Sequence, residues 1–466
     1  MKKALSAAMA AGMTAVMLAG CGSSASSAAE STAPAESTSA AASTEAAAES
    51  VVSAPTALSF VFADGDDTFK TQMNKIVDDF NASQDEIEIK AEYQGTYDDT
   101  ITKLKAAMQS DSGLPDVCQM YDVGTKFMYD SGAVIPVEDK FESTGYDKSS
   151  VMEVISSYYT VDGKQYAMPF NVSTPMLYYN KDVFEAAGLD PETPPTTYDE
   201  VLEDAKKIVE SGAAPVGYSQ AIYGWFFEQQ LAGLGVTYGN NDNGRKEAVT
   251  AVDFDSNGGG LKVFDMWKKL YDSGYFEDYG TTTADTQTAF FSGQVGMIIE
   301  STAILKNAVD SSPFEVGTGY LPRIEQNDEG GVIIGGGSLW LTDTGNEANE
   351  DAAWKFIEYI TTPDVQAKWS MGTGYFAINE KAYETEDMKA YLKENPNFET
   401  AINQLKDSPV NCNTAGVLSG VQTEARLTFN EIMPQVYDGK LTTQDAVDQL
   451  AVSVNKAIEN YNESIK

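Results

Sequence analysis

The sequence contains no histidine and only three cysteines among its 466 residues. The absence of histidine excludes serine–histidine triads, acid–base catalysis by imidazole and zinc sites that need a histidine ligand. Three cysteines are also too few for a structural zinc site built from four thiolates. The sequence therefore points away from the commonest hydrolase and zinc-protein chemistries.

Basic residues are scarce as well. The 31 lysines and arginines stand against 70 acidic residues, which gives a formal net charge of −39. Such a field repels phosphate backbones and anionic lipid head groups, so nucleic acid and acidic membrane surfaces are poor partners. Hydrophobic and aromatic contents of 42% and 11% are ordinary for a globular protein, and the length predicts two or three domains.

The first twenty residues have the character of a secretion signal. Two lysines precede an uncharged run from Ala4 to Ala19, which is shorter than the ~20 apolar residues of a membrane-spanning helix. The run ends in Leu18-Ala19-Gly20-Cys21, which resembles the lipobox of bacterial lipoproteins. We expect residues 1–20 to be removed and Cys21 to be lipidated, with a plain signal peptide as the alternative.

Residues 22–55 consist mainly of Ser, Ala, Thr and Glu and have no repeating apolar face. Alanine favours a helix, but the interspersed serines and threonines do not. We predict that residues 21–55 form a flexible tether, about 30 Å in root-mean-square length as a random coil. With several acyl chains such as palmitate on Cys21, the tether would hold the exported protein at the outer face of the bacterial cell membrane.

Lipidation of Cys21 leaves Cys118 and Cys412 in the folded part. In an oxidising compartment these two thiols could pair as a disulfide. Two buried free thiols fit the sequence at least as well, so the redox state stays open.

From Ala57 onward, short β-rich runs alternate with helical periodicities, and no repeat of 20–50 residues recurs. This alternation predicts open α/β sheets with helices on both faces. Ligands of such sheets bind beyond the carboxyl ends of the strands, so we expect the site in the loops after Ile89, Met120 and Ile299. The predicted strands are 58–62, 87–91, 116–120, 295–299 and 332–334, and the predicted helices include 66–80, 98–109, 198–210, 261–271, 352–360 and 443–465.

Two glycine-containing segments resemble ligand-binding loops without completing their patterns. Asp253 to Gly258 opens like an EF-hand calcium loop, but the twelfth position, which should be a bidentate Glu, is Phe264. Gly335-Gly336-Gly337-Ser338 follows the predicted strand 332–334 and is either an anion-binding nest or a plain turn. It lacks the Gly-Lys-Ser/Thr of a P-loop. We therefore expect no metal and no cofactor.

An enzyme is the second class of function that the sequence allows, because carboxylates are abundant and a glycosidase needs only two of them at the right separation. No spacing singles out such a pair. Aromatic residues are more informative, because exposed rings with polar tips suit sugars and polyols. Those in or beside predicted loops are Tyr93, Tyr97, Tyr121, Tyr158, Tyr159, Tyr223, Trp225 and Tyr375.

A longer block resembles a known family. The sequence Met-Pro-Phe-Asn-Val-Ser-Thr-Pro-Met-Leu-Tyr-Tyr-Asn-Lys at 168–181 resembles the signature of the extracellular solute-binding proteins of ABC importers, family 1. Further blocks in the same order and similar spacing resemble most closely the members that bind sn-glycerol 3-phosphate. These blocks are Tyr93 to Tyr97, Tyr121 to Thr125, Ile333 to Trp340, Thr373 to Tyr375, and the late Arg426.

The resemblance implies a two-lobed, periplasmic-binding-protein-like α/β fold of type II, with interleaved lobes, a hinge and a central ligand cleft. Residues 56–169 and 302–360 would form one lobe, and residues 170–301 and 361–466 the other. The crossing segments would lie near Phe170, Ser301 and Ile360. Hinge bending would close the cleft around a solute without covalent chemistry.

The resemblance also implies a set of solute contacts. These are Tyr97, Asp122, Ser173, Trp225, Ser301, Gly336, Tyr375 and Arg426. Two positions depart from the family pattern: Asp122 replaces a Glu, and Ile222 replaces the first of two tryptophans, of which Trp225 is the second. Arg426 would hold a phosphate with its planar fork, whereas composition alone favours a surface salt bridge there.

We therefore predict a lipid-anchored solute-binding protein that captures glycerol 3-phosphate, or a related glycerophosphodiester or carbohydrate, and delivers it to the membrane permease of an ABC importer. We expect a monomer that performs no catalysis. An oligosaccharide-binding protein of a sugar importer is the alternative. Other classes are a secreted enzyme that hydrolyses glycosides or phosphodiesters, and a carbohydrate-binding adhesin.

Overall fold

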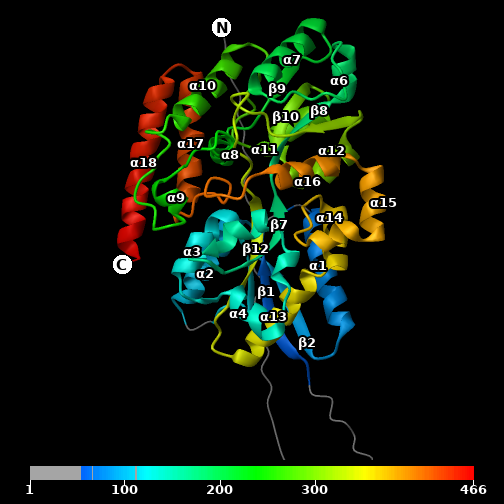
Figure 1. Ribbon diagram of the computed structural model, residues 1–466, viewed down its shortest axis with the longest axis vertical. Coiled ribbons are helices and arrows are strands. Elements are labelled where there is room, and N and C mark those ends of the chain that lie inside the picture. Colours follow the sequence, from blue (N-terminus) through cyan, green and yellow to red (C-terminus); the bar gives the residue numbers. More distant parts are fainter. Residues whose placement is uncertain (1–53, 64, 66, 111–112, 466) are drawn as a thin grey trace, which may run out of the picture. The chain divides into compact units, whose positions relative to one another are not determined.

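The computed structural model describes residues 54–63, 65, 67–110 and 113–465. The predicted signal peptide, Cys21 and nearly all of the predicted tether lie outside these residues. In the described part, the strands form two larger sheets and one two-stranded hairpin (Figure 1). The hairpin pairs β5 (Thr160–Val161) with β6 (Lys164–Gln165).

The larger sheet has six strands in the order β2-β1-β3-β12-β4, with β7 also paired to β12. Strand β1 runs parallel to β2 and β3, whereas β12 runs antiparallel to β3, β4 and β7. The bounds are β1 (Thr56–Phe62), β2 (Ile87–Tyr93), β3 (Val117–Tyr121), β4 (Val134–Ile135), β7 (Met168–Ser173) and β12 (Gly335–Thr342).

The second sheet has four strands in the order β11-β8-β10-β9. Its bounds are β8 (Pro175–Asn180), β9 (Val216–Ser219), β10 (Val295–Ser301) and β11 (Val316–Gly319). Only Thr174 separates β7 of the first sheet from β8 of the second, so the chain changes sheets there. This crossing lies four positions beyond Phe170, near which we predicted one.

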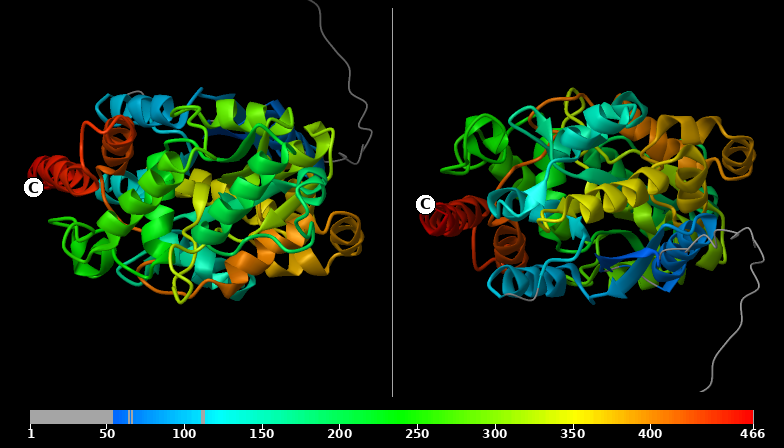
Figure 2. Two further views of the ribbon diagram at one scale, coloured as in Figure 1. Left: turned by 90° about the horizontal axis from the view of Figure 1, so that it is seen from above. Right: turned by 90° about the horizontal axis from the view of Figure 1, so that it is seen from below.

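Helices pack against both sheets and carry the predicted apolar faces inward. In α1, the side chains of Phe69, Met73, Ile76, Val77 and Phe80 are all buried. Helices α17 and α18 lie side by side near the C-terminus (Figure 2). The bounds are α1 (Asp67–Ser83), α2 (Tyr97–Met108), α3 (Thr125–Asp130), α4 (Val137–Thr144), α5 (Glu153–Ser156), α6 (Lys181–Ala186), α7 (Tyr198–Ser211), α8 (Gly224–Gly233), α9 (Asn240–Gly244), α10 (Gly259–Asp272), α11 (Thr283–Phe291), α12 (Leu305–Ser311), α13 (Glu347–Ile360), α14 (Pro363–Thr373), α15 (Glu386–Glu394), α16 (Asn397–Asp407), α17 (Gln422–Tyr437) and α18 (Thr443–Ser464).

The apolar core forms two clusters, and both reach the four-stranded sheet, with Met176 and Ile298 in one and Leu177 and Met297 in the other. One cluster surrounds the six-stranded sheet and includes Phe60, Trp340 and Trp354. The other joins the four-stranded sheet to α8, α10, α17 and α18, with Trp267 and Phe429 among its buried side chains. Within the described residues, no helix combines the length and the apolar character that crossing a membrane requires.

The predicted strand at 332–334 is wrong. Ile333 exchanges hydrogen bonds with the side chain of Gln229, which accepts from Ile333 N at 2.8 Å and donates to Ile333 O at 2.8 Å. An amide side chain thus replaces a neighbouring strand there. Strand β12 begins at Gly335 instead, so the glycine segment is strand rather than the plain turn we considered. The predicted strands 58–62, 87–91, 116–120 and 295–299 correspond to β1, β2, β3 and β10.

The lobe boundaries remain a prediction. Segment 302–360, which we assigned to the first lobe, contains both β11 of the four-stranded sheet and β12 of the six-stranded sheet. The two cysteines of the folded part are free thiols: Cys118 is buried in β3, and Cys412 is half-buried.

Candidate functional site

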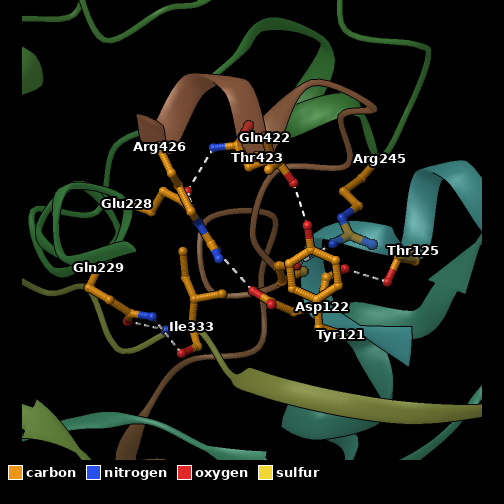
Figure 3. A network of polar contacts seen from close by, with 11 residues as sticks. Tyr121, Asp122, Thr125, Glu228, Gln229, Arg245, Ile333, Gln422, Thr423 and Arg426 are labelled. Atoms are coloured by element: carbon orange, nitrogen blue, oxygen red, sulfur yellow. Dashed lines mark hydrogen bonds and ion pairs between the residues drawn. The ribbon is translucent and has the colours of Figure 1, made fainter. Parts of the chain in front are cut away.

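A buried arginine and two carboxylates lie at the centre of the candidate site (Figure 3). Arg426, on α17, donates from Nε to Glu228 Oε1 and from Nη2 to Glu228 Oε2, both at 2.7 Å. Its Nη2 also donates to Asp122 Oδ2 at 2.9 Å. The side chains of all three residues are less than a tenth exposed. The arrangement is therefore a buried, charge-assisted network rather than a surface salt bridge.

The network holds Arg426 in its charged form. Burial disfavours the guanidinium cation, but Asp122 and Glu228 outweigh burial and raise the pKa of Arg426 well above its ordinary value. Gln422 Nε2 donates to Glu228 Oε1 at 2.9 Å and so satisfies a further acceptor. Within the described residues, Arg426 Nη1 makes no hydrogen bond, so it is the guanidinium nitrogen left to donate to a solute.

Close backbone packing sets the position of Arg426. A Cβ atom on Gly224, the first residue of α8, would lie 2.5 Å from Arg426 Cα. Only glycine allows this approach, which brings Glu228, one turn further along α8, against the guanidinium. Asp122 comes from the 3₁₀ turn after β3, where Thr125 Oγ1 donates to the Asp122 carbonyl at 2.7 Å.

Two stacked tyrosines stand beside the network. The rings of Tyr97 and Tyr121 are 4.9 Å apart and inclined by 10°. The Tyr121 hydroxyl bonds with the hydroxyl of Thr423 on α17. Asn171 Nδ2 donates to Tyr97 Oη at 3.0 Å, and Gln119 Nε2 donates to Asn171 Oδ1 at 2.8 Å. The Gln119 side chain thus orients the Asn171 side chain, which in turn orients Tyr97.

The start of β12 makes room for Trp225. A Cβ atom on Gly335 would lie 2.7 Å from Trp225 Cζ2, so the indole lies directly over this strand. Trp225 Nε1 is buried and has no hydrogen-bond partner among the described residues. Gly336 has φ +92°, and a Cβ there would lie 1.9 Å from the Asn171 carbonyl oxygen. Strand β12 therefore needs both glycines to approach α8 and β7.

Ser173, Ser301 and Tyr375 meet where the chain changes sheets. Ser173 ends β7, and Thr302 N, next to Ser301, donates to Thr174 O at 2.8 Å. Phe376 N, next to Tyr375, donates to Val172 O at 3.0 Å. The Tyr375 ring stacks on Trp369 at 5.9 Å. Gly336 pairs with Val172, so β7 joins this group to the rest of the predicted contacts.

A third carboxylate lies at the end of β10. Glu300 is buried, accepts from Ser301 N at 2.7 Å and accepts from Gln287 Nε2 at 3.0 Å. No basic side chain among the described residues forms an ion pair with it. Burial raises the pKa of Glu300 above its ordinary value. Burial also raises the pKa of Tyr223, to about 12. The charge of Arg426 lowers this pKa, whereas the charges of Asp122, Glu228 and Glu300 raise it. Tyr223 therefore lies within the field of all four charged groups.

A second, half-buried arginine ties the surrounding loops together. Arg245 donates from Nη1 to Tyr158 O at 2.8 Å and from Nε to Gly416 O at 3.0 Å. Its guanidinium lies 5.2 Å from the Tyr158 ring centroid. Burial lowers the pKa of Arg245 to about 10. Tyr158 therefore packs against this structural cation and is buried, unlike the exposed ring that a loop position predicted.

Sequence reasoning missed several members of the site. Glu228 and Gln422 were not predicted at all, although helical spacing carried a signal, and Tyr121 and Tyr223 were named only among the aromatic residues of the predicted loops. Glu228 follows Trp225 by three positions, and Arg426 follows Gln422 by four, so each pair shares a helix face. Trp225 itself is on α8 rather than in a loop, and Ile222 is fully buried in the core.

A cavity of about 570 Å³ lies apart from these residues. It is lined by the loop that follows β11 and by α16, with Tyr320, Arg323 and Gln404 among its residues. None of the eight predicted solute contacts lines it. Among the described residues, no cluster of three or more acidic or cysteine side chains could hold a metal ion.

Comparison with known proteins places the chain in a family. The profile of the bacterial extracellular solute-binding proteins matches residues 75–400. The sn-glycerol-3-phosphate-binding periplasmic protein UgpB of Escherichia coli K12 is 30% identical over 402 residues, which span 85% of this chain and 91% of that protein. The UgpB protein of Pectobacterium atrosepticum is also 30% identical, over 85% of this chain and 90% of its own.

Solved structures show the same fold. The cyclic α-maltosyl-1,6-maltose-binding protein of Arthrobacter globiformis has a TM-score of 0.72 at 25% identity and covers 87% of this chain and 100% of its own. UgpB of Mycobacterium tuberculosis, in complex with glycerophosphocholine, has a TM-score of 0.73 at 20% identity and covers 88% and 99%. These likenesses confirm the predicted α/β fold of the periplasmic solute-binding proteins. The relatives are binding proteins rather than enzymes, so the prediction that this chain is no enzyme is also confirmed. The chain thus belongs to the bacterial extracellular solute-binding proteins, as the solute-binding component of an ABC importer.

Proposed function

We propose that this protein captures a glycerol phosphate ester for its importer. The observation that carries the proposal is the buried contact between Arg426 and Asp122, from segments far apart in the sequence, beside a guanidinium nitrogen, Nη1, that makes no hydrogen bond among the described residues. That nitrogen would donate to a phosphate oxygen. The relatives that bind glycerol 3-phosphate and glycerophosphocholine support this class of solute.

Each part of such a solute finds suitable chemistry in the site. Asp122 and the hydroxyls of Ser173 and Ser301 would accept and donate hydrogen bonds to glycerol hydroxyls. The Trp225 indole, with its buried and unpartnered Nε1, offers both an apolar face and a donor. Tyr97 and Tyr375 would cover the carbon skeleton, and the Gly336 backbone would approach the solute closely.

A neutral oligosaccharide is the second candidate. The observation that favours it is the engagement of the Arg426 fork by Glu228, because a guanidinium balanced by carboxylates also suits uncharged hydroxyls. The stacked pair Tyr97 and Tyr121 offers the flat surface that sugar rings pack against. The similarity to the maltosyl-maltose-binding protein is consistent with this alternative.

We propose further that the protein acts as a monomer anchored by lipid on Cys21, with residues 21–55 as the tether. Two lobes, with the boundaries given above, would close by hinge bending at Thr174 and present the closed form to the permease. A Cys21→Ser variant tests the anchor: it should be recovered from the medium or periplasm rather than from the membrane fraction. A variant that stays with the membrane would argue against lipidation.

Calorimetric titration of the purified folded part tests the solute. We expect glycerophosphocholine or glycerol 3-phosphate to bind with a Kd of about 10 μM or tighter, as suits a receptor. Maltose and maltotriose serve as the carbohydrate probes. Binding of the sugars alone would replace the glycerol-ester proposal with the oligosaccharide alternative.

A further inference from the structure

We propose that Glu228 is a positioning residue that sets the charge specificity of the site, so that it selects solutes without net negative charge over phosphate monoesters. This inference rests on the proposed function and narrows its solute to a glycerophosphodiester with a cationic or neutral head group. Nothing in the sequence pattern that implied the solute contacts assigns a role to Glu228.

The first argument is geometric. An open arginine fork would grip a phosphate through two parallel N–H donors. In this protein, Glu228 occupies two donors of that fork, at Nε and Nη2, and Asp122 takes a further Nη2 contact. Gln422, one turn before Arg426 on α17, also donates to Glu228 Oε1, at 2.9 Å, and helps to hold this carboxylate in place. Only Nη1 is left for the solute, which suits one oxygen of a phosphodiester better than the three oxygens of a monoester.

The second argument is electrostatic. Arg426 brings one positive charge, whereas Asp122 and Glu228 bring two negative charges against it. Glu300 is a third buried carboxyl, at the end of β10 next to the predicted contact Ser301. The site thus carries a net negative charge with or without ionisation of Glu300. In a buried environment this net negative charge strongly opposes the binding of an anionic solute, because little water is present to screen the repulsion.

The chemistry of the two solutes then separates them. A phosphate monoester such as glycerol 3-phosphate carries nearly two negative charges at neutral pH. Glycerophosphocholine carries one, and its quaternary ammonium group cancels it. Glu300, which is next to the predicted contact Ser301 and forms no ion pair among the described residues, is the carboxyl that would face that cation. A zwitterion therefore adds no net charge to the site when it binds. A dianion adds two further negative charges, which the carboxylates of the site repel.

The test compares matched neutral and anionic solutes by calorimetry at pH 7.5. The probes are glycerophosphocholine with glycerol 3-phosphate, and maltose with maltose 1-phosphate. In the unaltered folded part, we expect the zwitterion to bind at least about tenfold more tightly than the monoester. Glu228→Gln keeps the shape of the side chain and removes its charge, so it should narrow this ratio at least about tenfold, mainly by strengthening monoester binding.

Three variants control for other effects. Glu424→Gln removes one charge from an exposed position of α17, the helix that carries Arg426, and should leave the ratio within about twofold, because exposed charges are screened. Glu228→Asp retains the charge and should retain the preference for the zwitterion. Should Glu228→Gln not fold, Asp122→Asn removes the other carboxylate from Arg426 and should shift the ratio in the same direction.

The outcomes separate this inference from the proposed function. Equal or tighter binding of glycerol 3-phosphate by the unaltered protein, or a ratio that survives Glu228→Gln, would overturn the role of Glu228 and leave a glycerol-ester receptor standing. Binding of maltose but not maltose 1-phosphate, with neither glycerol ester bound, would overturn the glycerol-ester function and support the charge selection. Failure of all four probes to bind would overturn both.

Discussion

Arg426 Nη2 lies 2.9 Å from Asp122 Oδ2, although the two residues are 304 positions apart in the sequence. The contact joins α17 to the turn after β3, and Tyr121 repeats the connection through its hydrogen bond to Thr423. The last residue of β3 and the first residue of the following turn thus contact two residues of one helix, α17. Any solute that reaches Arg426 therefore acts on both segments at once.

Removing the cation should destabilise the protein strongly. Arg426→Met leaves Asp122 and Glu228 as buried carboxylates without a counter-charge, so we expect the free energy of unfolding to fall by about 3–5 kcal/mol. Urea unfolding followed by circular dichroism measures it. Arg323→Met, at an exposed arginine, is the control and should change the free energy by less than about 0.5 kcal/mol. A loss below about 1 kcal/mol in Arg426→Met would mean that the network contributes little to folding.

Gly336→Ala should damage both stability and solute binding. The left-handed backbone at φ +92° disfavours any side chain, and a Cβ would collide with the Asn171 carbonyl oxygen at 1.9 Å. We expect a loss of about 2–4 kcal/mol in unfolding free energy, measured by urea titration, together with weaker solute binding. Gly345→Ala is the control that separates backbone strain from the steric collision. Gly345 also has a positive φ, of +69°, but no atom lies within 4 Å of the added Cβ. Equal losses in the two variants would show that backbone strain alone is responsible.

Glu300→Gln should stabilise the protein in a pH-dependent way. Burial raises the pKa of Glu300 in the folded state above its unfolded value, so ionisation opposes folding at pH values above the folded pKa. This penalty disappears as the pH falls below the unfolded pKa of about 4.3, where the carboxyl is protonated in both states. The amide should therefore add about 1 kcal/mol to the unfolding free energy at pH 7.5, and less at pH 4.5.

Thermal and urea unfolding of both proteins at the two pH values measure the effect of Glu300→Gln. Glu424→Gln, an exposed change of the same kind, should leave the unfolding free energy unchanged within about 0.5 kcal/mol at each pH. A Glu300→Gln protein that is less stable than the parent at pH 7.5 would show that the ionised carboxyl is stabilised by a group outside those named here.

The two free thiols of the folded part should differ in reactivity. Cys118 is fully buried and Cys412 is half-buried, and burial raises the pKa of both thiols. Iodoacetamide at pH 8 should therefore label Cys412 slowly in the native protein and Cys118 only after unfolding in urea. Mass spectrometry of the digested protein locates the label. Absence of any labelling in unreduced, unfolded protein would indicate a disulfide instead.

The sequence predicted the fold well where periodicity is strong. Helix α1 buries the five apolar residues that its spacing placed on one face, and β3 and β10 begin within one residue of their predicted positions. It failed at Val332 to Ile334, because an apolar run does not reveal that its hydrogen bonds go to the side chain of Gln229, about a hundred positions away. Long-range partners of this kind leave no mark on local sequence.

The site was only partly predictable, because its contacts also join residues that are far apart in the sequence. Family resemblance placed Asp122 and Arg426 in one cleft, and the structure brings them into direct contact. It did not predict that Glu228 occupies the guanidinium, because a single acidic residue among 70 gives no signal by itself. The helical spacing of Trp225 with Glu228, and of Gln422 with Arg426, becomes meaningful only after α8 and α17 are known to pack together.

The distance in sequence between Asp122 and Arg426 also bears on how an exported chain matures. A chain that crosses a membrane from its N-terminus delivers Asp122 and Glu228 long before Arg426. Until α17 arrives, both carboxylates lack their cation and favour hydration over burial. The proposed solute site therefore cannot be complete before α17 is present, and a chain cut short before α17 should be unable to bind its solute.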